Sequence, residues 1–176
     1  MIYIRGQAKD FDLWAQAGAT GWDWESVKPY FVGSVDQSRG PSPWHSSKGP
    51  LRLEDIKFKL PVCDALITAG IKAGLAYNED FNSADQEGIG YYQTTMRNGR
   101  RWSAANAYLD GIKNRPNLTI KTHAPIDRIV FDKDRAIGVI ANGQEITATK
   151  EVIVCAGAYS SPQLLQISGV GPKSVL

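Results

Sequence analysis

One stretch near the C-terminus, residues 152–171, constrains the fold of this chain more than any other part. Residues 152–155 form a continuous apolar run, which predicts a strand covered on both faces in a parallel sheet. The small residues Ala156 and Gly157 follow, and then Ser160, Ser161 and Pro162 favour the N-terminus of a helix that ends at Ser168-Gly169. The stretch therefore predicts a strand, a tight turn and a helix, where backbone can closely approach a ligand; many such turns bind nothing.

The spacing within this stretch resembles the second signature of the glucose-methanol-choline (GMC) oxidoreductases, flavoproteins that oxidise alcohols with FAD. The matching residues are Gly157-Ala158, Ser161-Pro162, Leu164-Leu165 and Ser168-Gly169-Val170-Gly171. Two more segments resemble the same family in the same order. Residues 1–15 resemble the sequence that follows its first, glycine-rich signature, and residues 99–109 resemble its GxRxSxxxAYL segment. The YIRG and QEGxG sequences at residues 3–6 and 86–90 are similar to those of choline dehydrogenase-like bacterial members.

The resemblance implies an FAD cofactor, a small-molecule alcohol substrate and hydride transfer from the substrate carbon to the flavin. It places Met1 and Ile2 near the flavin half of the cofactor, and Ile126, Ala156 and Gly157 near its ADP half. It transfers no catalytic residue and no metal ligand to this chain, because the family's catalytic histidine and its dinucleotide fingerprint fall outside these residues. We therefore expect an internal segment of a longer enzyme, inactive in isolation.

The fold class that follows is α/β, comprising part of a Rossmann-like FAD-binding domain with an inserted segment of an α+β substrate-binding domain. Residues 1–15 and 117–176 are assigned to the FAD-binding domain, and residues 16–116 mainly to the substrate domain and a lid at residues 38–47. A non-catalytic domain that binds a ligand or partner without redox chemistry is the alternative, and a lyase of the same family is a lesser one. The chain contains no G-x-G-x-x-G after an early strand, which favours the non-catalytic alternative for the isolated chain.

Composition narrows the classes further. With 20 basic and 18 acidic residues the charge is too balanced to indicate a nucleic-acid partner. No apolar run reaches the roughly 18 residues of a membrane span, so no membrane segment is expected. Cys63 and Cys155 lie far apart in apolar segments, which predicts two buried free thiols and a cytoplasmic location. The oligomeric state is not determined by these features.

Several chemistry-bearing residues are left with two interpretations. Tryptophans 14, 22 and 24 indicate either aromatic packing of short helices or a platform for a sugar. The arginines of residues 97–101 either contact a flavin or are solvated and paired with Asp85 and Glu87. His45 and His123 match no catalytic position and are given no chemistry. Tyr91 and Gln93 are possible pocket-lining residues, by analogy with the family or simply as part of a core.

Local patterns predict the remaining elements. Asp10 and Asp23 are expected to cap two short helices, with Tyr30 facing inward on the second. Pro61 is expected to open a helix whose apolar stripe includes Val62 and Leu66, and Ser103 one that runs to about residue 114. Residues 1–4 are expected to form a strand or an extended segment. Strands are expected at residues 49–53, 88–95, 118–120 and 126–131, followed by a hairpin, residues 136–149, that turns at Asn142-Gly143.

Overall fold

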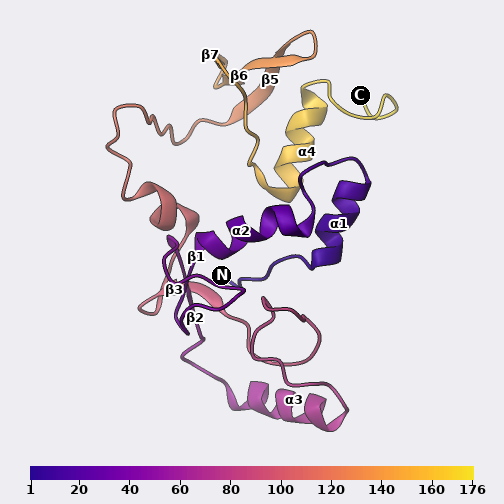
Figure 1. Ribbon diagram of the computed structural model, residues 1–176. Coiled ribbons are helices and arrows are strands. Elements are labelled where there is room, and N and C mark those ends of the chain that lie inside the picture. The colour runs from indigo at the N-terminus through magenta and orange to yellow at the C-terminus, as the bar shows by residue number, and fades with distance from the viewer. The chain divides into compact units, whose positions relative to one another are not determined.

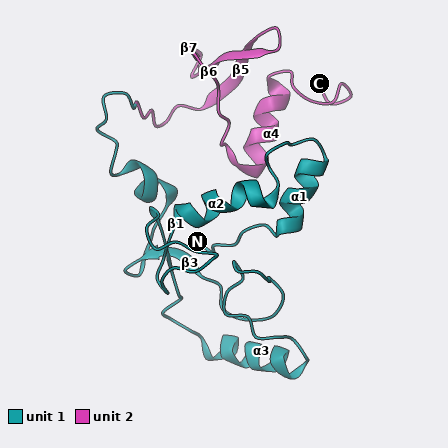
Figure 2. Ribbon diagram, viewed as in Figure 1, with its two compact units in different colours: residues 1–118 teal, residues 119–176 magenta.

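The computed structural model describes all 176 residues, which form two compact units, Met1–Leu118 and Thr119–Leu176 (Figure 2). Figure 1 traces their helices and strands along the chain. The boundary lies two residues beyond the predicted one at 116/117, and residues 1–15 lie in the first unit with residues 16–118. The assignment of these parts to FAD-binding and substrate-binding domains stays a prediction. None of the helices combines the length and the apolar character that crossing a bilayer requires.

A four-stranded sheet forms the centre of the first unit. Its strands are β1 (Val35–Gln37), β2 (Leu51–Glu54), β3 (Thr94–Arg97) and β4 (Arg100–Arg101), in that order, with β1 parallel to β2 and the others antiparallel. Val35 and Leu53 have no exposed surface and make the core of this sheet. Position 49, next to this sheet, requires a glycine, because a Cβ there would lie 2.3 Å from the backbone carbonyl carbon of Ser34.

Two short helices, α1 (Ala8–Gln16) and α2 (Trp24–Ser34), pack through aromatic side chains. The ring of the buried Phe11 lies 5.4 Å from that of Phe31 and 5.6 Å from that of Trp24, which confirms the interpretation as aromatic packing. The predicted N-cap of α2 is also confirmed, since Asp23 accepts a hydrogen bond from the Ser26 amide at 3.0 Å. The prediction that Tyr30 faces inward is wrong, because its side chain is 79% exposed.

The predicted N-cap of α1 at Asp10 is wrong by three residues, because the N-cap is Gln7. The helix begins at Ala8, and Asp10 is its third residue, where its carboxylate accepts a hydrogen bond from the Gln7 amide at 2.7 Å. An acidic residue suits both positions, because an N-cap side chain accepts from the N2 or N3 amide and an N3 carboxylate accepts from the N-cap amide, so the two are hard to distinguish from sequence.

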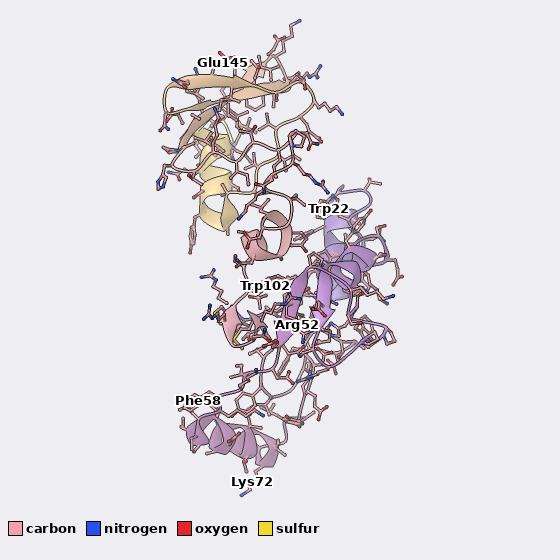
Figure 3. The ribbon with its side chains drawn as sticks, turned by 90° about the vertical axis from the view of Figure 1, so that its left-hand side faces the viewer. Trp22, Arg52, Phe58, Lys72, Trp102 and Glu145 are labelled. Carbon is pink, nitrogen blue, oxygen red and sulfur yellow. The ribbon has the colours of Figure 1, made fainter.

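The third helix, α3 (Pro61–Lys72), begins at Pro61 as predicted, with Phe58 and Lys72 near its two ends (Figure 3). Its predicted inward stripe is wrong, because Val62 is 69% and Leu66 66% exposed, whereas Cys63 and Ile67 are half-buried. The helix has apolar residues on more than one face, so periodicity alone did not select the buried one.

Three expected elements between residues 88 and 120 are shorter or missing. Of the strand expected at residues 88–95, only the last two residues are in a strand, at the start of β3 (Thr94–Arg97). Residues 118–120 form no strand. The helix expected from Ser103 is a single wide turn, η1 (Ala105–Leu109). Ser103 still makes the hydrogen bond expected of a capping residue, because its hydroxyl accepts from the Asn106 amide at 3.3 Å.

The second unit contains an antiparallel meander of β5 (Ile126–Asp132), β6 (Arg135–Ala141) and β7 (Gln144–Thr147), followed by α4 (Gly157–Ile167). The predicted hairpin is confirmed, and both turn residues have positive φ, 51° at Asn142 and 73° at Gly143. Helix α4 contacts β5 through Ser168, whose hydroxyl accepts a hydrogen bond from the Ile129 amide at 2.8 Å.

The predicted strand at residues 152–155 is wrong for this structure. These residues have no ladder partner, Ile153 is 76% exposed, and the Cys155 thiol expected to be buried is exposed. A strand is defined by hydrogen bonds to a neighbouring strand, and none of β5 to β7 pairs with this run. Helix α4 also starts earlier than expected, at Gly157, so that Pro162 lies inside it.

Candidate functional site

In the second unit, two of the residues selected from the sequence line one cavity. It has a volume of about 300 Å³ and is lined by Ile126, Ala156, Ser160, Gln163, Leu164 and Ile167. Ile126 opens β5, Ala156 immediately precedes α4, and the other lining residues follow one side of that helix to its last residue, Ile167, so the cavity lies between the first strand of the meander and α4. Residues 30 positions apart in the sequence are thereby brought together around the turn at Gly157.

The start of α4 is shaped for close approach. Gly157 has φ +87°, a conformation that residues with a side chain rarely adopt, and no atom lies within 4 Å of the position its Cβ would take. No side chain caps the first turn, although the Ser161 hydroxyl accepts a hydrogen bond from the Ala156 amide at 3.1 Å. The uncapped N–H groups and the helix dipole favour an acceptor or an anion at this point.

Met1 and Ile2 lie in the first unit, along the edge of β3. The Tyr3 amide donates to the Gln93 carbonyl at 2.9 Å, the Thr95 amide donates to the Met1 carbonyl at 2.8 Å, and Ile2 bridges Thr94. The backbone is held, yet the side chains of Met1 and Ile2 are 55% and 59% exposed. These two residues are thus fixed in place and presented outward.

Ile2 also lines an apolar cavity of about 320 Å³ with Phe58, Cys63, Tyr91 and Tyr92 among its other residues. The Tyr91 hydroxyl donates to Asp64 at 2.7 Å, and the Lys59 ammonium lies 4.5 Å from the centre of the Tyr91 ring. Partial desolvation and the Asp64 carboxylate raise the pKa of Tyr91 to about 12. The phenol therefore stays neutral at any physiological pH and acts as a hydrogen-bond donor.

Gln93, the other pocket-lining candidate, is buried and its side chain is fully engaged. Its amide forms two hydrogen bonds with the amide of Gln37, at 2.7 and 3.0 Å, and donates to Asp55 at 2.8 Å. Such a saturated pair ties β1 to the residue before β3, so the structure gives Gln93 a place in the core of the first unit.

Sequence reasoning missed a buried polar cluster around Arg5, which is only 5% exposed. Its guanidinium donates to the Trp44 carbonyl at 2.7 Å and the Phe31 carbonyl at 3.2 Å. One of its nitrogens lies 3.5 Å from Nδ1 of His45, whose Nε2 lies 2.7 Å from Oδ2 of Asp80. These partners are 26 to 40 residues away from Arg5, and no local pattern signals such contacts.

His45, which was given no chemistry from its sequence, is 3% exposed and anchors the segment expected to form a lid. Backbone hydrogen bonds between Ser42 and His45, and from Gln37 to Ser46, hold the same segment against β1. The Asp80 carboxylate that faces the imidazole is only partly exposed. Burial alone would raise its pKa, but hydrogen bonds from His45 and the Asn82 amide hold the pKa of Asp80 below its usual range.

The basic segment at residues 97–101 forms the β3–β4 hairpin, with positive φ at Asn98 and Gly99. Arg97 lies 4.6 Å from the centre of the Trp102 ring and 3.8 Å from a carboxylate oxygen of Asp36. Figure 3 shows Trp102 close to the strands of this sheet, which also bear Arg52. The predicted pairing of these arginines with Asp85 and Glu87 is wrong, because those acidic residues belong to a separate turn that is bonded to Asn78.

The family model for GMC oxidoreductase matches residues 1–175 of the chain. The chain belongs to the GMC oxidoreductase family. Among similar proteins, the "oxygen-dependent choline dehydrogenase" of Pseudomonas putida is 46% identical over 185 residues, which cover all of this chain and 33% of that protein. The chain thus spans about a third of the length of the curated relatives it matches.

Solved structures agree with this family and with the α/β fold. Pyridoxine 4-oxidase from Mesorbium loti matches 99% of this GMC chain with a TM-score of 0.87 and 34% identity, over 35% of its own length. An FAD-dependent oxidoreductase from Chaetomium thermophilum matches 99% of it with a TM-score of 0.85 and 28% identity, over 33% of its own length.

Proposed function

We propose that this chain is part of an FAD-dependent oxidoreductase that acts on the CH–OH group of alcohols. The observation that carries the proposal is the 46% identity to an oxygen-dependent choline dehydrogenase, which extends over the whole of the chain. When bound, FAD supplies the acceptor for the hydride of the substrate carbon. The residues of this chain hold and orient the cofactor and shape the surface that the alcohol approaches.

The cavity of the second unit is proposed to hold the ADP half of FAD. Ile126 and Ala156 line it, as proposed from the resemblance for the adenosine end, and Gly157 leaves its helix start without a side chain. The uncapped N–H groups of α4 suit a phosphate or ribose oxygen. Ile126 is 40% exposed and offers apolar surface to a ring.

Met1 and Ile2 are proposed to contact the flavin half. Both are presented outward from a backbone that is hydrogen-bonded to residues 93–95, so they form a firm apolar surface. Ile2 is continuous with the apolar cavity that holds Tyr91 and Tyr92, which suits a small alcohol with an apolar or cationic substituent. Choline is the first substrate to test because of the relative named above.

We propose a cytoplasmic location for the protein. Its support is that Cys63 and Cys155 are both free thiols, as expected where disulfides are kept reduced. Fractionation of the source cells with an antibody to the chain tests it.

FAD binding is the first experiment. The 176-residue chain and a chain extended at both ends to the length of the relatives are each titrated into FAD while flavin fluorescence is followed. We expect quenching by the extended chain alone, and bleaching of its bound flavin on anaerobic addition of choline. An extended chain that binds no FAD would contradict the proposal, and one that binds FAD but reacts only with other alcohols would contradict choline alone.

A matched pair of glycine substitutions tests the cavity. Gly157→Val places a side chain at φ +87°, beside the proposed phosphate position, and should weaken FAD binding by about tenfold. Gly111→Val is the control, because Gly111 has no atom within 4 Å of its Cβ position and an ordinary φ. Equal FAD affinity in the two variants would place the ADP half elsewhere.

A further inference from the structure

The Arg5 side chain joins the N-terminal segment to two segments that are distant in sequence, at Phe31 and at Trp44-His45. Its Nη1 donates to the Trp44 carbonyl at 2.7 Å, its Nη2 to the Phe31 carbonyl at 3.2 Å, and its Nε to the Tyr3 hydroxyl at 3.0 Å. The remaining contact is from Nη2 to Nδ1 of His45 at 3.5 Å. All three nitrogens of the planar guanidinium therefore have partners. Lysine, with a single ammonium, cannot reproduce this arrangement.

The contact with Arg5 bears on the tautomer of His45. A guanidinium can only donate, so the 3.5 Å separation favours Nδ1 of His45 as the acceptor and Nε2 as the protonated ring nitrogen. Nε2 then donates to Oδ2 of Asp80 at 2.7 Å, and Oδ1 of Asp80 accepts from the Asn82 amide at 3.0 Å. The side chains of Arg5, His45 and Asp80 are here called the Arg5 cluster. In it Arg5 donates to His45, and His45 donates to Asp80.

The Arg5 cluster is linked through Asn82 to the segment that carries Met1 and Ile2. The Arg5 amide donates to Oδ1 of Asn82 at 2.8 Å, and Nδ2 of Asn82 donates to the Tyr3 carbonyl at 3.1 Å. On the other side, the Tyr3 amide and the Met1 carbonyl are bonded to β3 and the residue before it. Because the side chains of Met1 and Ile2 are mostly exposed, burial does little to hold them, and their place depends on these polar contacts.

We propose that Arg5, His45 and Asp80 are positioning residues that hold Met1 and Ile2 at the flavin half of the cofactor site. The inference rests on the proposed function, since it concerns the same site. None of the three side chains needs to touch the cofactor, and each acts through the backbone of residues 1–5. The cluster also ties the segment of residues 42–45 to this site, because His45 and the Trp44 carbonyl are both bonded to Arg5.

The first test removes the fork of donors. Arg5→Gln is compared with Arg115→Gln, an exposed arginine, in the chain extended to the length of the relatives. We expect amide hydrogen exchange at Tyr3 and Thr95 to accelerate by about tenfold or more in Arg5→Gln, with FAD affinity weakened by about tenfold. Arg115→Gln should leave both unchanged.

The second test removes no bulk and guards against simple misfolding. In Asp80→Asn the new amide donates toward Nε2 of His45, so the ring proton moves to Nδ1, where it faces the donor of Arg5. We expect the same direction of change at Tyr3 and Thr95 as in Arg5→Gln, about threefold or more, although neither residue contacts Asp80. A merely local role for Asp80 would change exchange only at residues 80–83.

The outcomes separate the two proposals. Faster exchange at Tyr3 and Thr95 with unchanged FAD affinity and unchanged kcat and KM would overturn the positioning role and leave the proposed function standing. Unchanged exchange in both variants would overturn it as well, whatever the activity. A wild-type extended chain that binds no FAD would overturn the proposed function, and the positioning role with it, while the exchange data would still show whether the cluster anchors residues 1–5.

Discussion

The two units of this chain are built from contacts of different range. In the first unit, β3 pairs with β2 across some 40 residues, and Arg5 is bonded to residues up to 81 positions away. In the second unit, β5, β6 and β7 follow one another in sequence and pair with their neighbours through tight turns. The first unit therefore depends on a few buried contacts between distant segments, whereas the second depends on local turn geometry and strand register.

The aromatic residues allow the two units to be observed separately. All five tryptophans, at positions 14, 22, 24, 44 and 102, belong to the first unit. Tryptophan fluorescence of the 176-residue chain therefore follows that unit, and amide exchange at Ile129 and Val139 follows the meander.

The largest expected effect is at Leu53, which has no exposed surface in the first sheet. Leu53→Ala should lower the free energy of unfolding by about 2–5 kcal/mol, because it leaves a cavity among fixed neighbours. Urea unfolding followed by tryptophan fluorescence measures the loss, with the exposed Leu66→Ala as control. A comparable change in exchange at Ile129 would contradict the separation of the two units.

The next effect is the counterpart in the second unit. A Cβ on Gly138 in β6 would lie 2.4 Å from the Ile146 carbonyl oxygen on β7. Gly138→Val should therefore destabilise the meander by about 1–3 kcal/mol, with faster exchange at Val139 and little change in tryptophan fluorescence. Undisturbed pairing of β6 with β7 in this variant would show that the strands adjust more easily than the backbone positions suggest.

A smaller effect depends on pH and concerns Asp80. Because its pKa is lowered in the folded state, its stabilisation is present above the unfolded pKa of about 3.9 and is lost as the pH falls through the folded pKa. Asp80→Asn should thus cost about 1–2 kcal/mol near neutral pH, a figure limited by partial solvent screening, and almost nothing at the acid end. Unfolding of both proteins across this range, measured by tryptophan fluorescence, checks the sign. A cost that grew toward low pH would refute it.

The smallest expected effect is at the hairpin turn of the second unit. Gly143 has φ +73°, so Gly143→Ala should cost about 1 kcal/mol and accelerate exchange in β6 and β7 together. Gly111→Ala, at a position of ordinary φ, provides the control. A loss confined to β7 would indicate that the turn does not set the register of β6.

Prediction of the fold from sequence succeeded where the signal is local. Asp23, Pro61 and the Asn142-Gly143 turn each determine a helix start or a hairpin through their own backbone preferences. It failed where a partner decides the outcome. Residues 152–155 are apolar enough for a buried strand, yet a strand also requires a neighbour that pairs with it.

The residues of the candidate site likewise include some that the sequence indicated and others that only distant partners reveal. The resemblance to the family pointed to Ala156, Gly157 and Ile126, and the structure brings Ile126 and Ala156 to one cavity. Their cofactor role stays a prediction. Arg5 and His45 could not have been selected, because an arginine and a histidine become buried only when oppositely placed acceptors and donors from distant segments satisfy them.

Patterns within the sequence were enough to indicate the family, the starts of α2 and α3 and the meander of the second unit, because each depends on residues close together in the chain or on a pattern of fixed spacing. Only the folded chain shows which face of α3 is buried, that Gln93 is enclosed in the core, and that Arg5, His45 and Asp80 are bonded to one another. The physical reason is that burial of polar groups requires complete hydrogen bonding, and its partners are brought together only by the folded chain.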